Sequence, residues 1–269
     1  MSGMAPEILR RLDELAAITA EPGTLTRMFL TPEHARANAL VMTWMTGAGM
    51  TARIDAIGNV VGRYEGITTH APALLLGSHL DTVRDAGRYD GMLGVVTAIA
   101  CVADLHRRSV RLPYAIEIVG FADEEGVRFG ATLLGSRALA GNIDPALLDR
   151  RDDAGVAMRD ALIAFGLDPG AIPAAARKPE EFHAYLEFHI EQGPLLEQHN
   201  LAVGCVTSIS GASRLRVSIT GEAGHAGTVP MGRRRLHPRG RATLFGCARP
   251  RRHRRPDRGR AGGGQRHFG

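Results

Sequence analysis

The feature that most constrains this chain is a strand–helix–strand pattern between residues 73 and 125. A nearly all-aliphatic run at 73–76 is followed by a longer segment, 92–105, with apolar residues at helical spacing. A second apolar run follows at 114–121. Short aliphatic runs suit strands buried on both faces, and a crossover helix between two strands makes them parallel. The sequence therefore predicts an α/β fold in which helices flank a mostly parallel sheet.

Side chains that can bind metals or move protons lie where these elements begin or end. They are His79 and Asp81 after the first strand, Asp90 before the helix, and Glu124 and Glu125 after the second strand. In open parallel sheets, ligands bind beyond the carboxyl ends of the strands. We therefore expect these side chains to converge at one edge of the sheet, with Asp90 capping the N-terminus of the helix.

Each of these residues has an ordinary structural interpretation when taken alone. A His-x-Asp pair is frequent, and adjacent glutamates usually occupy a solvated loop. His189, in a strand expected over 182–191, would more often be a hydrogen-bonded core histidine. Gathered at one sheet edge, however, carboxylates and imidazoles would repel one another or be poorly solvated without a cation. Mixed histidine and carboxylate ligands suit zinc, manganese, cobalt or nickel better than magnesium or calcium.

The composition of the chain bears on where the protein is expected to be located. The sequence has no run of about 18 apolar residues, so no membrane-spanning helix is expected. Residues 1–20 alternate charged and apolar side chains and lack the apolar centre of a secretory signal peptide. Three widely spaced cysteines, Cys101, Cys205 and Cys247, form neither a disulfide framework nor a zinc motif, which favours a reducing, cytoplasmic location.

The net charge of +5 comes from the C-terminal segment. Residues 232–269 hold 13 of the 33 basic residues and a single acid, Asp257, so residues 1–231 carry 20 basic and 27 acidic side chains. An arginine-rich arm of this kind can bind nucleic acid through phosphates. Only Phe245 and Phe268 could stack on bases, and no recognisable nucleic-acid-binding fold precedes the arm. Nucleic acid is therefore a disfavoured partner.

The rest of the chain carries weaker signals of secondary structure. Helices are expected at 6–19, 32–46, 133–140, 145–150 and 152–165, a hairpin at 52–64, and further strands at 202–210 and 214–220. The small and polar residues at 210–213 indicate a hinge between two domains.

Five motifs occur in order along the chain: HLDTV, GRYDGMLGV, FADEEGVRFG, FHIEQGPLLE and GEAGHAGTVPM. In order and spacing they resemble the dinuclear metal amidohydrolases. That family includes allantoate amidohydrolase, N-carbamoyl-L-amino-acid hydrolase and β-ureidopropionase, and it is related to aminoacylase and carboxypeptidase. The resemblance covers residues 5–231. It implies a zinc-peptidase-like catalytic domain followed by a smaller α+β lid that forms the dimer contact.

The resemblance also implies a metal-binding role for each matching position. Two divalent ions per subunit, zinc or manganese with cobalt or nickel as alternatives, would be held by His79, Asp90, Glu125 and His189. Asp90 would bridge the two ions. Asp81 would orient the imidazole of His79, which fixes its tautomer and basicity.

Three further residues would act on the substrate in such an enzyme. Glu124 would be the general base, taking a proton from water and passing it to the leaving nitrogen. Gln192 would contact the substrate. His225, between Gly224 and Gly227, would reach into the neighbouring subunit's site to stabilise the oxyanion.

The function implied by the resemblance is hydrolysis of a carbon–nitrogen bond other than a peptide bond, in a linear amidine or amide. The residues of the motifs FADEEGVRFG and HIEQGPLLE resemble those of the branch that acts on small-molecule ureido or N-carbamoyl substrates. Allantoate, cleaved with release of ammonia and carbon dioxide in purine catabolism, is the first expectation. N-carbamoyl-L-amino acids and β-ureidopropionate are alternatives, followed by aminoacylase or dipeptidase substrates. A homodimer without a membrane partner is expected.

The resemblance stops after Met231. The family continues with the rest of the lid, then returns with another metal-binding histidine and a substrate-binding arginine. This chain instead stays rich in Arg, Gly, Pro and Ala, and its single lysine, Lys178, indicates GC-rich coding. We therefore hypothesise that the tail is a frameshift product and the chain a truncated enzyme; a poorly folding, inactive chain is the alternative. The expected organisation is a catalytic domain at 1–211, the start of a lid at 212–231 and a disordered arginine-rich tail at 232–269.

Overall fold

The computed structural model describes residues 3–209, 213–218 and 241–246 of the chain. The chain divides into two compact units, Met1–Gly193 and Pro194–Gly269. The first unit therefore ends before residue 211, the boundary expected from the sequence.

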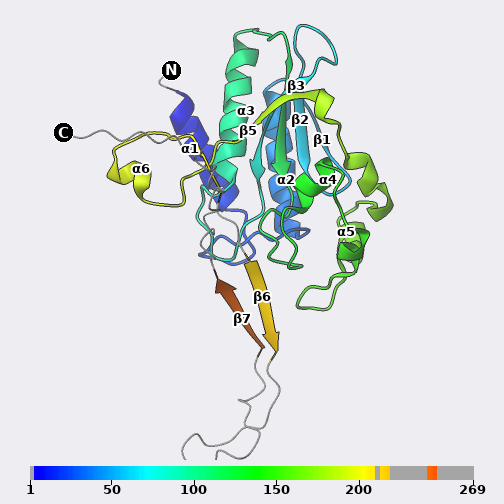
Figure 1. Ribbon diagram of the computed structural model, residues 1–269. Helices are drawn as coiled ribbons and strands as arrows, with labels where there is room; N and C mark the ends of the chain where they lie inside the picture. Colours follow the sequence, from blue (N-terminus) through cyan, green and yellow to red (C-terminus); the bar gives the residue numbers. More distant parts are fainter. Residues whose placement is uncertain (1–2, 210–212, 219–240, 247–269) are drawn as a thin grey trace, which may run out of the picture. The chain divides into compact units, whose positions relative to one another are not determined.

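A five-stranded sheet forms the centre of the first unit, with the strand order β1-β2-β4-β3-β5 (Figure 1). The strands are β1 (Thr51–Ile54), β2 (Val60–Tyr64), β3 (Ala73–His79), β4 (Ala115–Phe121) and β5 (Phe182–Leu186). β3 pairs in parallel with both β4 and β5, so these three strands end at the same edge. The expected α/β fold is confirmed. The sheet is mixed rather than mostly parallel, because the β1–β2 hairpin joins β4 antiparallel.

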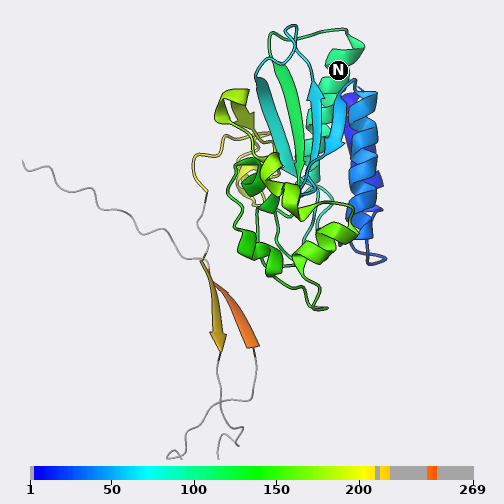
Figure 2. The same cartoon turned by 90° about the vertical axis from the view of Figure 1, so that its right-hand side faces the viewer.

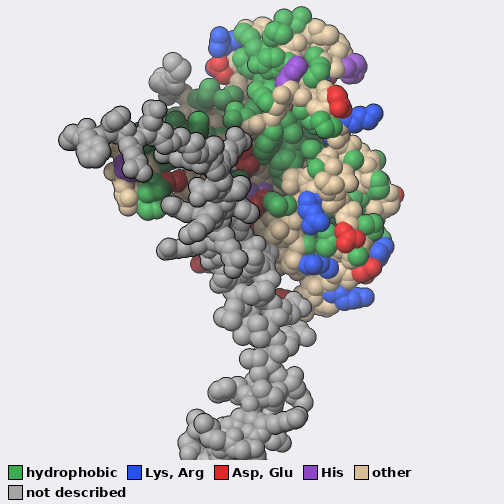
Figure 3. All heavy atoms as spheres, in the orientation of Figure 1, with side chains coloured by type: hydrophobic (Ala, Val, Ile, Leu, Met, Phe, Trp, Pro, Cys, Tyr) green, Lys and Arg blue, Asp and Glu red, His purple; other side chains and the backbone are tan. Residues whose placement is uncertain are grey.

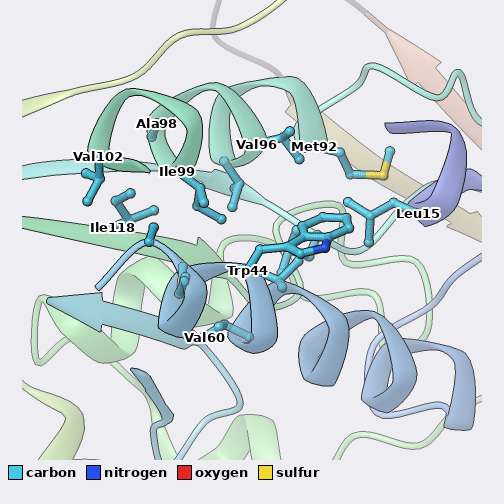
Figure 4. Close-up of a cluster of buried hydrophobic side chains, with 14 of the residues drawn as sticks. Leu15, Trp44, Val60, Met92, Val96, Ala98, Ile99, Val102 and Ile118 are labelled. Carbon is cyan, nitrogen blue, oxygen red and sulfur yellow. The ribbon is translucent and has the colours of Figure 1, made fainter. Parts of the chain in front are cut away.

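Three helices cover one face of this sheet. They are α1 (Met4–Ala16), α2 (Pro32–Gly47) and α3 (Met92–Arg107). Figure 4 shows their apolar side chains meeting those of the strands, among them Leu15, Trp44, Val96 and Ile118. The start of α2 follows the capping rules, because Pro32 is its first residue and Thr31 Oγ1 accepts the His34 N–H at 3.2 Å. This helical layer backs the strands that carry the polar residues.

Short helices lie beside and below the sheet in Figure 2, and α4 packs on the face opposite α2 through Leu139. They are α4 (Leu134–Leu139), η1 (Pro145–Asp149), α5 (Met158–Ala164), η2 (Pro169–Ala175) and η3 (Pro179–Glu181), the three η elements being 3-10 helices. The helix expected at 152–165 begins only at Met158. The reason is that Asp152 Oδ1 accepts the N–H groups of Ala154 and Val156, which closes a turn in place of a helical start.

Two strand predictions downstream are wrong, because one strand is shorter than expected and the other is not found. β5 stops at Leu186, so His189 follows the strand instead of lying in it, and no strand is found among the described residues of 202–210. The second unit instead contains α6 (Leu195–Gln198) and an antiparallel pair, β6 (Ser213–Ser218) with β7 (Arg241–Gly246). β7 lies inside 232–269, the segment expected to be disordered.

The edge strand β5 carries exposed apolar side chains. Figure 3 shows hydrophobic atoms gathered on the face of the molecule over which β5 lies, and Tyr185, Leu186 and Phe188 are all exposed. In the described part of the chain β5 pairs only with β3. Every helix of the described residues is too short or too polar to cross a membrane.

Candidate metal centre

His79 is the last residue of β3 and is almost fully buried. Its Nδ1 lies 2.8 Å from the main-chain carbonyl oxygen of Asp81. Because a carbonyl can only accept, Nδ1 carries a proton in this contact, so in the neutral ring Nε2 is the nitrogen with the free lone pair. That Nε2 faces Asp90, with 3.7 Å to Oδ1. The ring is therefore held in the tautomer that a metal ligand needs.

His189 repeats this arrangement from the segment after β5. Its Nδ1 donates to the main-chain carbonyl of Ile190 at 2.9 Å, and its Nε2 lies 3.2 Å from the same Oδ1 of Asp90. The rings of His79 and His189 are stacked with their centroids 5.9 Å apart. The ligating atoms of His79, Asp90 and His189 all lie within 4.8 Å of one another. The predicted convergence of these residues is thus confirmed.

Asp90 does not cap α3, contrary to the sequence-based expectation. Gly91 is the N-cap residue, with φ 73°, and no side chain bonds the helix start. The Asp90 carboxylate is consequently free to turn toward the two histidines. A Cβ at Gly91 would lie 2.4 Å from His79 Nε2, so only glycine permits the close approach of helix and imidazole.

Glu124 and Glu125 lie on the loop after β4 and are half-buried. Their N–H groups donate to the two oxygens of the Asp81 carboxylate, at 3.0 and 3.2 Å. Ligating atoms of His79, Glu124 and Glu125 also lie within 4.8 Å of one another. The Asp81 carboxylate therefore holds the glutamate loop. It is the Asp81 carbonyl that orients His79, because the carboxylate is 4.0 Å from Nδ1.

The charges of this cluster are unbalanced. Burial raises the pKa of Glu124 and of Glu125, and although the neighbouring His79 opposes this effect, Asp81 adds to it for both. Burial lowers the pKa of His79, but the Asp90 hydrogen bond and the charge of Asp81 outweigh it and raise the pKa to about 9. Carboxylates that resist ionisation beside an imidazole that resists deprotonation indicate a site short of positive charge.

A divalent cation fits this donor set. The two imidazole Nε2 atoms and an Asp90 oxygen make a compact mixed set of the kind that suits zinc or manganese, and the Nδ1 contacts supply the outer support that such ligands need. Glu125 is the remaining carboxylate expected to ligate, and its pKa is affected by Asp90. All four residues predicted as ligands therefore lie at one sheet edge.

Gln192 and His225 are the remaining predicted site residues. Gln192, at φ 55°, donates its side-chain amide to both oxygens of Asp90, at 3.2 and 3.1 Å. Its predicted contact with a substrate stays a prediction. His225 lies outside the described residues. A cavity of about 370 Å³ borders His79 and Glu124, with Tyr185 and Glu187 among its lining residues, and offers space beside the site.

Sequence reasoning missed two supports of this edge. Asn59 accepts the Ala122 N–H and donates to the Gly135 carbonyl, which fixes the end of β4. Arg27 is fully buried and bonds the carbonyl of Leu80. An arginine directly before the apolar run 28–30 is the signal that could have identified it.

The comparisons with known proteins agree with this geometry. A family model described as peptidase family M20/M25/M40 matches residues 75–250, well over half of the chain. The chain belongs to this family. The M20 match continues past Met231, where the resemblance was expected to stop, so it includes β7.

Individual M20 relatives extend the match toward the N-terminus. A protein of Oryza sativa subsp. japonica named "Probable allantoate deiminase" is 45% identical over 87% of this chain and 49% of its own length. The N-carbamoyl-L-amino acid amidohydrolase of Geobacillus stearothermophilus is 44% identical over 84% of this chain and 56% of its own. A crystal structure of AtUAH in complex with glyoxylate is 36% identical with a TM-score of 0.76, covering 84% of this chain and 55% of that one. This chain thus spans about half the length of these relatives.

Proposed function

We propose that this chain is the metal-binding part of an amidohydrolase that cleaves a ureido or N-carbamoyl carbon–nitrogen bond. The observation that carries the proposal is the approach of His79 and His189, each through Nε2, to one oxygen of Asp90. The named relatives that hydrolyse allantoate or N-carbamoyl-L-amino acids support the substrate class.

Two divalent ions would be held by His79, Asp90, Glu125 and His189. When bound, such ions supply Lewis acidity, which polarises a substrate carbonyl and makes water more acidic.

Glu124 is the residue that would move the proton. It is half-buried and next to Glu125, it lies outside the set formed by the two histidines and Asp90, and its raised pKa makes its carboxylate a better base than an ordinary glutamate. Glu124 would take a proton from water as the oxygen attacks the carbonyl carbon. The same carboxyl would give that proton to the nitrogen as the C–N bond breaks, so that ammonia leaves.

Allantoate is the first proposed substrate, with N-carbamoyl-L-amino acids second. Both molecules carry a terminal ureido group and a carboxylate. We also propose zinc or manganese as the metal, a homodimer as the assembly and a cytoplasmic location, in line with the exposed free thiols of Cys101 and Cys205.

Ammonia release tests the proposal. Metal-free protein is supplied with manganese or zinc and with allantoate, N-carbamoyl-L-amino acids or N-acetyl-L-amino acids in parallel. We expect metal-dependent ammonia release that is faster with allantoate than with the carbamoyl-amino acid, and that falls ~100-fold or more in Glu124→Gln. Turnover of the N-acetyl-amino acids alone, followed as released amino acid because their hydrolysis gives acetate and no ammonia, or turnover that does not need a metal, would overturn the assignment.

A further inference from the structure

The segment 25–27 runs beside the loop that connects β3 to the metal-ligating residue Asp90. The Thr82 N–H donates to the Arg27 carbonyl at 3.0 Å, and the Arg27 N–H donates to Thr82 Oγ1 at 2.9 Å. Further along, the Ala86 N–H donates to the Leu25 carbonyl at 2.8 Å. The first part of the loop, at residues 82 and 86, is therefore paired with a segment that contributes no ligand of its own.

The Arg27 side chain adds contacts that reach three separate elements. Its Nε donates to the Leu80 carbonyl at 2.9 Å, at the end of β3. One terminal nitrogen donates to the carbonyls of Leu15 and Ile18, at 2.7 and 2.9 Å, at the end of α1. The other lies against the sulfur of Met92, the first residue of α3, at 2.6 Å. One buried guanidinium thus ties together the end of β3, the start of α3 and the end of α1.

The positive charge of Arg27 is compensated by main-chain carbonyls instead of an ion pair. Among the described residues, no carboxylate lies within ion-pair distance of Arg27. The carbonyls at the C-terminus of α1 carry the negative end of the helix dipole. That helix has no basic residue in its own last turn, so the Arg27 guanidinium takes the place of one. Asp81 is the charged group that favours the protonated guanidinium from a distance, while burial lowers the pKa of Arg27 to about 10. The group therefore stays charged at neutral pH.

Arg27 holds both neighbours of Asp81, since Leu80 and Thr82 are the two residues that it bonds. Asp81 in turn contacts three residues of the site: its carbonyl accepts from His79, and its carboxylate accepts from the N–H groups of Glu124 and Glu125. A displacement of the segment 80–82 would therefore move an imidazole and the glutamate loop together.

We propose that Arg27 is a positioning residue of the metal centre, acting through Leu80, Asp81 and Thr82 to fix His79, Glu124 and Glu125. This rests on the proposed metal-binding function of the cluster. Arg27 touches neither the ligating atoms nor the space between them, so its effect is on the geometry of the ligands. A lysine at this position has one nitrogen and cannot span Leu80, the end of α1 and Met92 together.

Cobalt binding by the whole chain is the first test, with Arg27→Met and Arg27→Lys compared with Arg63→Met. Arg63 is the control, because it is an arginine that is partly buried and donates to a main-chain carbonyl, that of Ala71 before β3, away from the site edge. We expect Arg27→Met to bind Co²⁺ ~10-fold or more weakly and to change its visible absorption spectrum. Arg27→Lys should be intermediate and Arg63→Met unchanged, each measured where circular dichroism shows a folded chain.

Amide hydrogen exchange in the metal-free chain is the second test and does not depend on the proposed function. Exchange of the Glu124 and Glu125 amides should accelerate in the Arg27 variants relative to the amides of β2, whereas Arg63→Met should not show this selectivity. Unchanged cobalt affinity, spectrum and relative exchange in a folded Arg27→Met, or in Arg27→Lys if the methionine variant does not fold, would overturn the proposal. Absence of cobalt binding by the unmodified chain, with the selective exchange retained, would overturn the metal centre alone.

Discussion

His189 places its Nε2 3.2 Å from Oδ1 of Asp90, although the first residue follows β5 and the second precedes α3. The parallel pairing of β3 with β5 makes this meeting possible, since it brings the end of β5 beside the end of β3. Because His79 approaches the same oxygen, Asp90 lies between two imidazoles whose other nitrogens are already engaged.

Gly91→Ala should damage the centre without removing any ligand. The new Cβ would lie 2.4 Å from His79 Nε2, and the backbone φ of 73° disfavours alanine. We expect a loss of about 1–3 kcal/mol in the free energy of unfolding together with weaker metal binding. Chemical denaturation and metal titration measure the two effects. Gly87→Ala is the control, because a Cβ there meets nothing within 4 Å. Equal behaviour of the two variants would contradict the close approach described here.

Asp81→Asn should loosen the glutamate loop. One of the two carboxylate oxygens that accept the Glu124 and Glu125 N–H groups becomes an amide NH₂, so one buried acceptor is lost. Metal affinity is expected to fall ~10-fold or more, although the His79 contact with the Asp81 carbonyl survives. Calorimetric titration with manganese measures this change. An affinity equal to that of the unmodified chain would show that the Asp81 carboxylate does not hold the loop.

Glu124→Gln should separate metal binding from turnover. Its carboxylate is proposed as the base and lies outside the set of His79, Asp90 and His189. We expect cobalt or manganese affinity within a few-fold of normal and ammonia release reduced ~100-fold or more. Substantial remaining activity would remove Glu124 from the role of general base.

His34 should make the fold sensitive to acid. Burial, assisted by the charge of Arg27, lowers the pKa of His34 from an ordinary 6.5 to about 3. Between these values the unfolded chain holds a proton that the folded chain does not, so stability falls as the pH decreases, by about 1.4 kcal/mol per pH unit. His34→Phe should flatten this dependence between pH 6 and 4, since Phe29 and Phe165 already surround the ring. An unchanged slope in His34→Phe would contradict the assignment.

The parts of this structure that follow from local chemistry could be predicted from the sequence. The β3–α3–β4 unit is one such part, because its aliphatic strands and the helical spacing of its apolar residues can be recognised in the sequence. The ligand positions follow from that unit, since strand ends in a parallel pairing share an edge. The separate contacts of the Asp81 carbonyl and the Asp81 carboxylate could not be predicted. They depend on how the loop at 123–125 turns, with Asp123 at φ 52°.

The position of His189 shows a second limit of sequence reasoning. The strand pattern at 182–191 continues beyond Leu186, but the chain leaves the sheet there. The turn that follows is set by tertiary contacts, such as Gln192 on Asp90, that periodicity does not encode. Arg27 was missed for the same reason, because its partners at Leu15, Leu80 and Met92 come from three separate elements.

The most direct test of the central claim is calorimetric titration of the metal-free chain with Mn²⁺ or Zn²⁺, comparing the unmodified protein with His189→Ala and His183→Ala. His183 is an exposed histidine on β5, with its ring against Tyr114 and away from the cluster, so it controls for the loss of an imidazole. The account predicts saturable binding that is weakened ~100-fold or more by His189→Ala and unaltered by His183→Ala. Equal affinities in all three proteins would contradict a metal centre shared by His79, Asp90 and His189.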